Sequence, residues 1–400
     1  MATLKVKLGG LELDNPIVIS SGDVARTEVG IRKADRFRPG AIVLKTSLLE
    51  AEYTQIIKPY EPGEFPDYRA KYFWHEGSLF GTAGSLSHWP VETWAEWLKK
   101  HKSEIATPLI GSATGFSVES YAEAAKLYEE AGADAFEINY GCPDEHLRRS
   151  PYTGPLNQEI LREIIYALRK AVSIPLGVKT GSFYWSVRLA KEAGLDYVAI
   201  NSVILGAIAL DIEKVEPVLP AGFGVVGSRA AKYPNFRTLL RVGDLINEMC
   251  IVGIGGIQSW EDIVEYILYG ASLVGIHSIF VYKGFKIIPD MKQGLLDYMT
   301  RHNFNTIDDM KGIIVPKILP RNLAIYAQTK GKIVAEVDQS KCTACGACED
   351  VCAFDAVKLS DGIVVINEGD CEGCGACVTS CPEKALTLRN LHLLRELTVC

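Results

Sequence analysis

The chain has 400 residues, of which 48% are hydrophobic and 23% are charged, and its formal net charge is −7. This length predicts two globular domains, and the negative charge argues against nucleic acid or an anionic membrane as the default partner. No run approaches the ~20 apolar residues of a membrane helix, and the start MATLKVKLGG lacks the apolar segment of a secretory signal. We therefore expect a protein of the reducing cytoplasm.

Short β-branched runs alternate with amphipathic stretches along residues 1–310. The stretches SVESYAEAAKLYEEAG (117–132) and NQEILREIIYALRKAV (157–172) repeat apolar residues at helical spacing. This alternation is typical of a parallel sheet buried on both faces, and eight units fit a (β/α)8 TIM barrel, with an open doubly wound sheet as the alternative. The eight runs are PIVISSG (16–22), AIVLKT (41–46), PLIGSAT (108–114), AFEINYGCP (135–143), PLGVKT (175–180), YVAINS (197–202), IVGIGG (251–256) and LVGIHS (273–278).

Polar residues gather where these runs end, which is where such barrels place their active sites. Lys45 and Lys179 follow apolar residues that would bury them, and a buried ammonium needs an anion. GIGG (253–256) precedes the helical pattern QSWEDIVEYILYGA, so we expect backbone N–H groups and that helix N-terminus to form a phosphate cradle. Glycines needed only for tight turns are the alternative.

The stretch GFGVVG (222–227) matches the G-x-G-x-x-G pattern of dinucleotide-binding folds. It does not follow a clear strand, and Lys232 to Pro234 should interrupt the helix that the pattern requires after it. We interpret it instead as a glycine-rich loop between strands six and seven of the barrel. No nicotinamide site is expected in this chain.

Eight of the eleven cysteines form two runs, CTACGACEDVC (342–352) and CEGCGACVTSC (371–381). Each has the spacing C-x2-C-x2-C-x3-C of two-cluster ferredoxins, in which the fourth cysteine ligates the other cluster. Zinc is the competing ligand, and Ala353 stands where the run usually has proline. The pattern predicts two 4Fe–4S clusters, one held by Cys342, Cys345, Cys348 and Cys381 and the other by Cys371, Cys374, Cys377 and Cys352.

We therefore expect a barrel over residues 1–315, a linker over 316–336 and a ferredoxin-like α+β domain over 337–400. Two-cluster domains commonly carry electrons, so the barrel should contain a group that uses them.

Several motifs together resemble one family of flavin barrels. NPIVISSG, IVLKT, FEINYGCP, GVKT, INS and IVGIGGIQSWEDIVEYILYGAS occur in the order found in the FMN barrel of the dihydroorotate and dihydropyrimidine dehydrogenases. The resemblance covers roughly residues 3–300. Together with the cysteine runs, it makes the chain most similar to the ferredoxin-bearing catalytic subunit of bacterial dihydropyrimidine dehydrogenase.

The resemblance implies an oxidoreductase that reduces, or forms, an activated C=C bond. Hydride would come from N5 of FMN, a proton from Cys142, and electrons through the clusters. Lys179 would stabilise the reduced ring, and Asn139, Asp144, Asn201 and Ser202 would face the substrate. The residues implied in FMN binding are Ser21, Gly22, Lys45, Thr46, Asn139, Lys179, Asn201, Gly227, Gly255, Gly256, His277 and Ser278.

Some residues depart from the family pattern. The loop WHEGSLFGTAGSLSHW (74–89) lacks an asparagine that pyrimidine-reading relatives use, and Asp144 would repel a carboxylate such as that of orotate. Arg229 and Lys232 intrude into the family's glycine-serine turn. We therefore predict the reaction type, and the ring that is reduced need not be a pyrimidine.

Three alternatives stay open. Cys142 could be a buried structural thiol, as we expect for Cys250 and Cys400. NYGCP also resembles the tRNA-dihydrouridine synthases, although a chain of charge −7 shows no obvious RNA surface. The barrel could also be a non-catalytic electron-transfer subunit. As partners we expect a small unsaturated substrate, ferredoxin or a separate NAD(P)H-flavoprotein subunit, and, by resemblance, a second copy in a homodimer.

Overall fold

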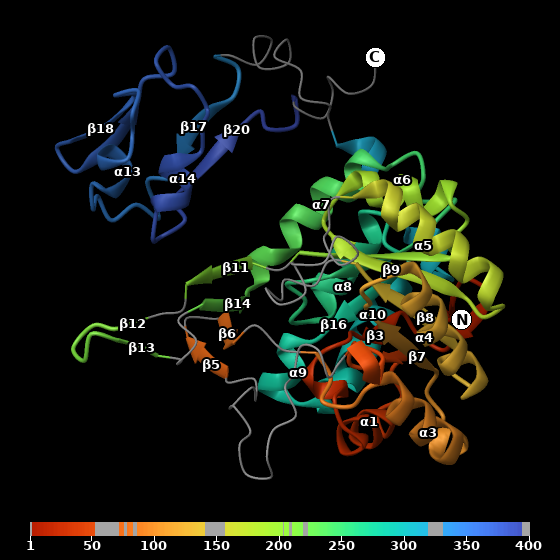
Figure 1. Cartoon of the computed structure of the whole chain (residues 1–400). Coiled ribbons are helices and arrows are strands. Elements are labelled where there is room, and N and C mark those ends of the chain that lie inside the picture. Colours follow the sequence, from red (N-terminus) through yellow and green to blue (C-terminus); the bar gives the residue numbers. More distant parts are fainter. Residues whose placement is uncertain are drawn as a thin grey trace. The chain divides into compact units, whose positions relative to one another are not determined.

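A computed structural model describes residues 2–52, 72–75, 78–82, 86–140, 157–202, 204–207, 210–218, 223–318 and 331–393. The chain divides into two compact units, Met1–Val315 and Pro316–Cys400, which are described one after the other (Figure 1). None of the helices formed by the described residues is long and apolar enough to cross a membrane.

Eight parallel strands of the first unit close into a barrel. Each barrel strand pairs with the next barrel strand along the chain, and the last pairs with the first. Each strand lies in one of the eight predicted runs, give or take one residue, so the predicted TIM barrel is confirmed and the open sheet is wrong. The strands are β3 (Ile17–Ile19), β4 (Ala41–Val43), β7 (Leu109–Ala113), β8 (Ala135–Asn139), β9 (Leu176–Gly181), β10 (Tyr197–Asn201), β15 (Cys250–Ile254) and β16 (Leu273–Ile276).

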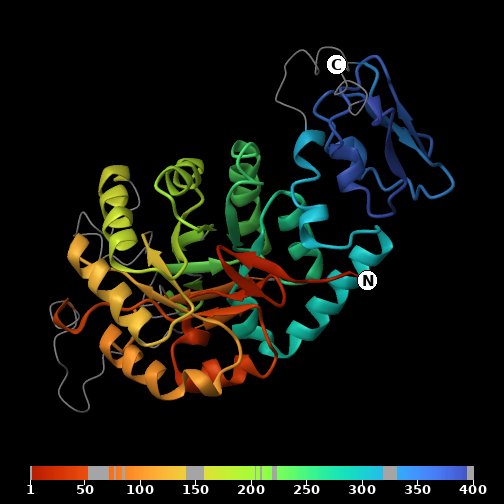
Figure 2. The same ribbon diagram turned by 90° about the vertical axis from the view of Figure 1, so that its right-hand side faces the viewer.

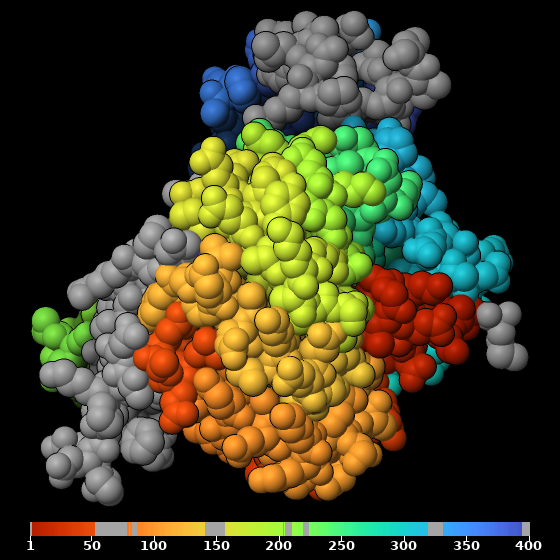
Figure 3. All heavy atoms as spheres, turned by 45° about the vertical axis from the view of Figure 1, so that its right-hand side comes forward, coloured from red at the N-terminus to blue at the C-terminus, as the bar shows by residue number. Residues whose placement is uncertain are grey.

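Helices surround the barrel, as Figure 2 shows, and the orange to yellow-green surface in Figure 3 belongs to the middle part of the first unit. Several helices begin where the sequence provides a cap; for example, the side chains of Ser117 and Asn157 accept from first-turn N–H groups of α4 and α5. The helices are α1 (Glu28–Asp35), α3 (Val91–His101), α4 (Val118–Glu130), α5 (Gln158–Ala171), α6 (Tyr184–Glu192), α7 (Lys232–Arg241), α8 (Trp260–Leu268), α9 (Ser278–Lys283), α10 (Ile288–Arg301) and α11 (Ile307–Met310). Short 3-10 turns are η1 (Asp23–Ala25), η2 (Lys102–Glu104), η4 (Arg229–Ala231), η5 (Phe285–Ile287) and η6 (Val315–Lys317).

The barrel interior is apolar at one end and polar at the other. A hairpin of β1 (Val6–Leu8) and β2 (Leu11–Leu13) covers the end where the strands begin, and its Leu8 and Leu13 pack against inward-facing residues such as Val43, Ile110 and Leu273. Side chains alternate between the two faces of a strand, so the next inward positions lie towards the strands' carboxyl ends. These positions carry the polar residues that line the site described below.

A second, antiparallel sheet lies beside the barrel (Figure 1). Its order is β11 (Ile204–Ala207), β14 (Phe223–Gly227), β6 (Ser78–Thr82) and β5 (Tyr72–His75), and a two-residue ladder of β12 (Leu210–Asp211) and β13 (Glu216–Pro217) follows β11. The prediction of a loop at 222–227 was wrong, because β14 pairs with both β11 and β6. The expected helix break was also wrong: α7 begins at Lys232 and Pro234 lies in its first turn, where no intrahelical N–H bond is lost.

The second unit has two similar halves. In one, β17 (Val334–Val337) pairs with β20 (Leu386–Arg389), and in the other β18 (Val357–Ser360) pairs with β19 (Ile363–Ile366). The short helices α13 (Ala347–Asp350) and α14 (Ala376–Ser380) each follow a glycine with φ of 80°, Gly346 and Gly375. This left-handed conformation favours glycine, so the small residues inside the cysteine runs are required by the backbone.

Candidate active site

A cavity of about 190 Å³ lies at the carboxyl ends of the barrel strands. All twelve residues that the family resemblance implies in FMN binding line it, together with Ser202, although they come from segments spread over more than 250 residues of the chain. Residues of β6 and β14 complete the wall. The predicted acid Cys142 and the predicted substrate residue Asp144 lie outside the described residues.

One wall of the cavity is a hydrogen-bonded chain of short polar side chains. The Thr46 hydroxyl lies 2.9 Å from the hydroxyls of both Ser21 and Ser112, and it accepts a 3.1 Å hydrogen bond from the side-chain amide nitrogen of Asn139. This chain fixes the Asn139 amide, whose oxygen is buried and has no hydrogen-bond partner in the structure. Asn139 is therefore a preorganised acceptor on the wall of the cavity.

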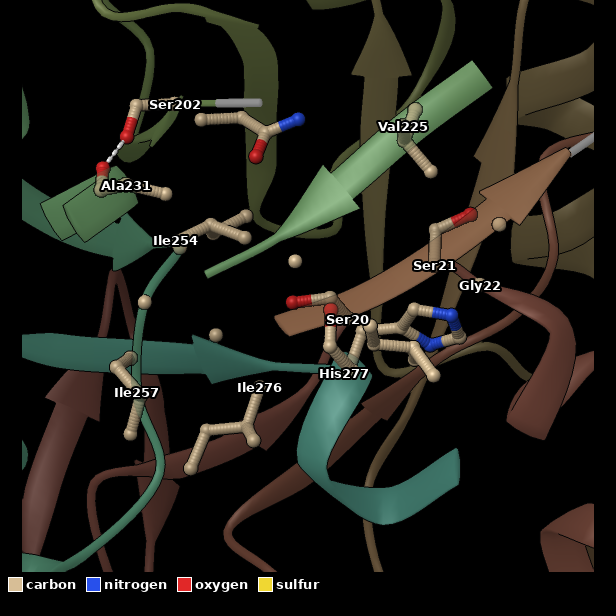
Figure 4. Close-up of a pocket in the computed structure, with 18 of the residues that line it drawn as sticks. Ser20, Ser21, Gly22, Ser202, Val225, Ala231, Ile254, Ile257, Ile276 and His277 are labelled. Atoms are coloured by element: carbon tan, nitrogen blue, oxygen red, sulfur yellow. Dashed lines mark hydrogen bonds between the residues drawn. The ribbon is translucent and has the colours of Figure 1, made fainter. Parts of the chain in front are cut away.

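Two further orphaned polar atoms belong to Ser20 and His277, which lie close together (Figure 4). The Ser20 hydroxyl and His277 Nδ1 are both buried without a hydrogen-bond partner. Burial lowers the pKa of His277 to about 4; Asp23 opposes this, and Lys45 and Lys179 add to it. The imidazole is thus neutral at physiological pH. Buried polar groups are rarely left unpaired, so these atoms point to a ligand that pairs with them.

The glycines at 255 and 256, where a phosphate cradle or a tight turn is expected, both line the cavity. Their φ angles are +126° and +72°, and a Cβ on either would lie 2.6 Å from a backbone oxygen, of Ser202 and Arg229 respectively. The helix start that is available to a ligand is that of α9, whereas the sequence had indicated the start of α8. Asp262 already accepts the N–H groups of Gln258 and Ser259 at the start of α8, whereas the first residues of α9, Ser278 and Ile279, line the cavity.

Arg229 and Lys232, which depart from the family's glycine-serine turn, are not among the residues that line the cavity. The Lys232 ammonium is buried and binds Asp262 at 2.6 Å and also Glu265, while Arg229 contacts Asp262 at 2.9 Å. Burial alone would raise the pKa of Asp262, but these two cations lower it below its usual value. Both basic residues thus join η4 and α7 to α8, behind the glycine cradle.

Ser202 lines the cavity, but its hydroxyl donates to the backbone oxygen of Ala231 (Figure 4). It can still accept from a ligand. Of the two lysines, Lys45 is buried with 8% of its surface exposed and Lys179 is half-buried.

Asp23 is a lining residue that the motifs did not indicate. Its carboxylate lies 3.5 Å from Lys45 Nζ and 3.1 Å from Arg26 Nη2. Its position directly after the SSG motif at a strand end was the only signal in the sequence.

Glu137 is a second residue that sequence reasoning missed. It is 3% exposed inside the barrel, and one of its carboxylate oxygens has no hydrogen-bond partner. Burial raises its pKa to about 7, an effect that Lys179 partly offsets. Because side chains alternate along a strand, its place two residues before Asn139 on β8 could have indicated that both face inward.

The eight described cysteines of the second unit form two groups. One small cavity is lined by Cys342, Cys345, Cys348 and Cys381, and another by Cys352, Cys371, Cys374 and Cys377. These are the two sets of four that the spacing predicts. Backbone N–H groups donate to three of the sulfurs, Ala335 to Cys371, Ala344 to Cys342 and Ala385 to Cys381. Such N–H···S contacts suit thiolate ligands of an iron–sulfur cluster.

The barrel cavity also fits the group that the motifs imply. FMN combines a phosphate with a polar ring edge, and the lining of the cavity offers the two glycines, the unpartnered polar atoms of Asn139, Ser20 and His277, and two lysines.

Comparison with known proteins supports this description. The family model described as dihydroorotate dehydrogenase matches residues 80–299, and one described as a 4Fe-4S dicluster domain matches residues 341–385. The catalytic subunit of dihydroorotate dehydrogenase B (NAD(+)) from Thermoplasma acidophilum is 27% identical over 318 residues, covering 79% of this chain and 100% of the relative. That from Pyrococcus abyssi is 28% identical over 316 residues, covering 78% and 98%.

A crystal structure of DHODH from Eimeria tenella in complex with ferulenol shares the fold, with a TM-score of 0.59 at 17% identity, over 78% of this chain and 88% of that one. The match to the first family model spans more than half of the chain. The chain therefore belongs to the dihydroorotate dehydrogenase family and carries a C-terminal 4Fe–4S ferredoxin-like domain.

Proposed function

We propose that the chain is an FMN- and iron–sulfur-dependent oxidoreductase that reduces, or forms, an activated C=C bond in a small molecule, in the manner of dihydropyrimidine dehydrogenase. The observation that carries this proposal is the joint placement of the twelve implied FMN residues around one cavity. The two groups of four cysteines supply a route for the electrons. When bound, FMN would supply hydride transfer at N5 and would exchange single electrons with the clusters.

The residues of the cavity have distinct roles in this proposal. Gly255, Gly256 and Ser278 bind the phosphate through backbone N–H groups, which their positions at the cradle and at the start of α9 make available. Both Lys179 and Asn139 line the cavity; the Lys179 ammonium would stabilise the negative charge of the reduced ring, and the fixed Asn139 amide would bind the ring or the substrate. Thr46 holds that amide in position.

The proton comes from Cys142 in this proposal. The thiol follows β8 by three residues, and a free thiol with its ordinary pKa near 8.5 is protonated at neutral pH, so it can donate a proton to carbon and its thiolate can take one back. Asn201 and Ser202 at the end of β10 line the cavity and would orient the substrate.

The chain would exchange electrons with another protein. The relatives from Thermoplasma and Pyrococcus are named as catalytic subunits of an NAD(+) enzyme, which fits a separate flavoprotein subunit as the partner. Ferredoxin is the other partner that the clusters suit. We further propose that residues 1–315 form the flavin domain, that 337–400 form the cluster domain, and that the chain assembles as a homodimer in the cytoplasm.

Oxidation of dihydroorotate is a second candidate function, because the relatives carry that name. The two candidates differ in substrate and share the chemistry.

Anaerobic purification tests the proposal. The full chain should show flavin absorbance together with iron and acid-labile sulfide for two 4Fe–4S clusters, and its reduced form should be reoxidised by an electron-poor alkene. Cluster absorbance without flavin absorbance would instead favour the alternative that the chain is a non-catalytic electron-transfer subunit. Salt-sensitive binding of an RNA pool, with a linear fall of affinity in log salt, would instead favour a tRNA-modifying enzyme.

A further inference from the structure

Glu137 is a buried carboxyl that the proposed function leaves without a role. It stands in the middle of β8 between Ala135 and Asn139, and side chains alternate along a strand, so all three face the barrel interior. Ala135 packs in the apolar cluster at the end where the strands begin, whereas Asn139 lines the cavity. Glu137 therefore occupies the layer of side chains directly below the cavity.

Lys179 is the charged neighbour of Glu137 on the adjoining strand. In the parallel ladder Glu137 lies opposite Ser112 of β7 and Gly177 of β9, and Lys179 is the next inward-facing residue of β9. Gly177 has no side chain, and the ring of Tyr197 from β10 fills the space beside it. Lys179 lines the cavity, and its charge acts on Glu137. It thus lies one layer above the carboxyl and faces the cavity.

The other groups around the carboxyl are uncharged. Burial raises the pKa of Tyr197 well above its ordinary value, so the phenol stays neutral. Ser112 does not titrate, and the surrounding helices pack on the outward-facing residues of β8. Among the described residues, the ionisation of Glu137 is therefore governed by burial and by Lys179.

These two effects oppose each other. The residue is 3% exposed, and one carboxylate oxygen has no hydrogen-bond partner. Burial favours the protonated carboxyl because an isolated buried charge is costly, whereas the ammonium of Lys179 favours the carboxylate. The pKa of about 7 reflects this balance. A change of charge beside Lys179 would therefore change whether Glu137 holds a proton near neutral pH.

A flavin ring in the cavity would supply such a change. In the proposed function Lys179 stabilises the negative charge that the ring gains on reduction. That charge would raise the affinity of Glu137 for a proton, because the ammonium is then shared by two anions and a like charge disfavours the carboxylate. The coupling is reciprocal, so a protonated Glu137 would favour the reduced ring.

We propose that Glu137 is a proton-holding residue that acts on the flavin through Lys179 and takes up one proton from solvent when the ring is reduced. Two electrons from the clusters and one proton give the ring one negative charge, and a second proton converts the carboxylate of Glu137 to the neutral acid. The net charge of the site is then the same before and after reduction. The inference rests on the proposed function, because it requires FMN in the cavity.

The test is a redox titration of the full chain with its FMN bound, followed by flavin absorbance between about pH 6 and about pH 9. A tenfold change in a two-electron equilibrium is about 30 mV, so uptake of one proton shifts the potential by about 30 mV per pH unit and uptake of two doubles this slope. The wild type should show the doubled slope over a part of the range where Glu137→Gln shows the single slope.

The two proteins should also differ in potential at one end of the range. At the acidic end Glu137 is protonated in both oxidation states, so wild type and Glu137→Gln should agree. At the alkaline end the wild-type carboxylate opposes reduction, and the potential of Glu137→Gln should be higher by at least ~30 mV, which corresponds to a tenfold change in proton affinity.

Three further variants separate this role from a structural one. Glu137→Asp keeps a titratable carboxyl and should keep a region of doubled slope. Lys179→Ala should lose that region, because without the ammonium the buried carboxyl stays protonated in both oxidation states. Glu163→Gln, an exposed position on α5, makes the same change in net charge and should match the wild type.

Infrared difference spectra test the proton itself. Reduction of the wild type should produce the signal of a protonated carboxyl, and this signal should be missing from Glu137→Gln. The wild-type spectrum decides if Glu137→Gln does not fold.

Equal slopes in wild type and Glu137→Gln, or a reduced wild type without a new protonated carboxyl, would overturn the inference. Protein that holds no FMN refutes the proposed function before any titration begins, whereas FMN-bound protein with equal slopes refutes the inference alone. The two failures are therefore distinguishable.

Discussion

The imidazole of His277 packs against Gly22 so closely that a Cβ on residue 22 would lie 2.3 Å from Nδ1. Both residues were predicted as separate flavin contacts. In the structure the absence of a side chain at Gly22 leaves the space that the His277 ring occupies. The segments that follow β3 and β16 are therefore in contact at the cavity.

In Gly22→Ala the added methyl group should therefore displace the His277 ring or the backbone at the cavity. Either the ring moves or the backbone shifts, at a cost of about 1–3 kcal/mol in unfolding free energy. We expect lower FMN content and a lower midpoint of chemical denaturation. Gly10→Ala is the control, since no atom lies within 4 Å of a Cβ there and it should change neither quantity. Equal FMN content in both variants would show that the Gly22 contact does not matter for binding.

Glu137 should make stability fall as pH rises. Its folded pKa of about 7 exceeds the ordinary value of 4.5, so the folded state binds the proton more tightly and loses stability between these two pH values. The loss amounts to about 3 kcal/mol at 1.36 kcal/mol per pKa unit. Glu137→Gln cannot ionise and should therefore be more stable than wild type at pH 8 but not at pH 4.5.

Denaturation of the flavin-free chain at the two pH values measures this difference. Glu163→Gln, an exposed position on α5, should show none. A Glu137→Gln effect that is the same at both pH values would contradict the raised pKa.

Asp262 should be needed to keep Lys232 buried. Asp262→Asn leaves a buried ammonium with Glu265 as its remaining carboxylate partner, which should destabilise the barrel by about 3–5 kcal/mol. Because the folded pKa of Asp262 is lowered, its stabilisation is present above the ordinary value of 3.8 and is lost as pH falls through the folded pKa. Thermal unfolding measures the effect, and Glu261→Gln in the same turn of α8 should be nearly silent because Glu261 is exposed.

Cys142→Ala should slow proton transfer to the substrate while FMN and iron stay bound. A general acid commonly contributes ~10²–10⁴-fold in rate, so reoxidation of the reduced enzyme by its alkene should slow by at least ~10²-fold while FMN and iron stay bound. Cys250→Ala is the matched control, because that thiol stands at the start of β15 and does not line the cavity. Unchanged kinetics in Cys142→Ala would assign the proton to another group.

Lys179→Ala should weaken the binding of reduced FMN more than the binding of oxidised FMN. Loss of the ammonium removes the charge that opposes the reduced ring, so the potential of bound FMN should fall by about 30 mV or more, equivalent to ~1.4 kcal/mol for two electrons. Spectroelectrochemistry measures the shift, with the exposed Lys99→Ala as control. A wild-type potential would count against this role.

The sequence by itself determined the barrel and the grouping of the cysteines. Both rest on periodic or local patterns: eight β-branched runs between amphipathic helices, and a spacing of thiols that suits one kind of cluster. The residues that line the cavity could be predicted because family motifs stand at the strand ends, and a closed parallel barrel brings all those ends to one face.

Only the tertiary structure decided how charged groups pair across that face. In the sequence, Arg229 and Lys232 only depart from the family's glycine-serine turn; the structure shows that both pair with Asp262 of α8. In the same way, nothing in the sequence indicates that Asp23 pairs with Lys45, which follows β4. The sequence separations of these pairs range from 22 to 33 residues. No local pattern encodes them, because the strength of an ion pair depends on distance and burial, and both are fixed only when the strands close the barrel.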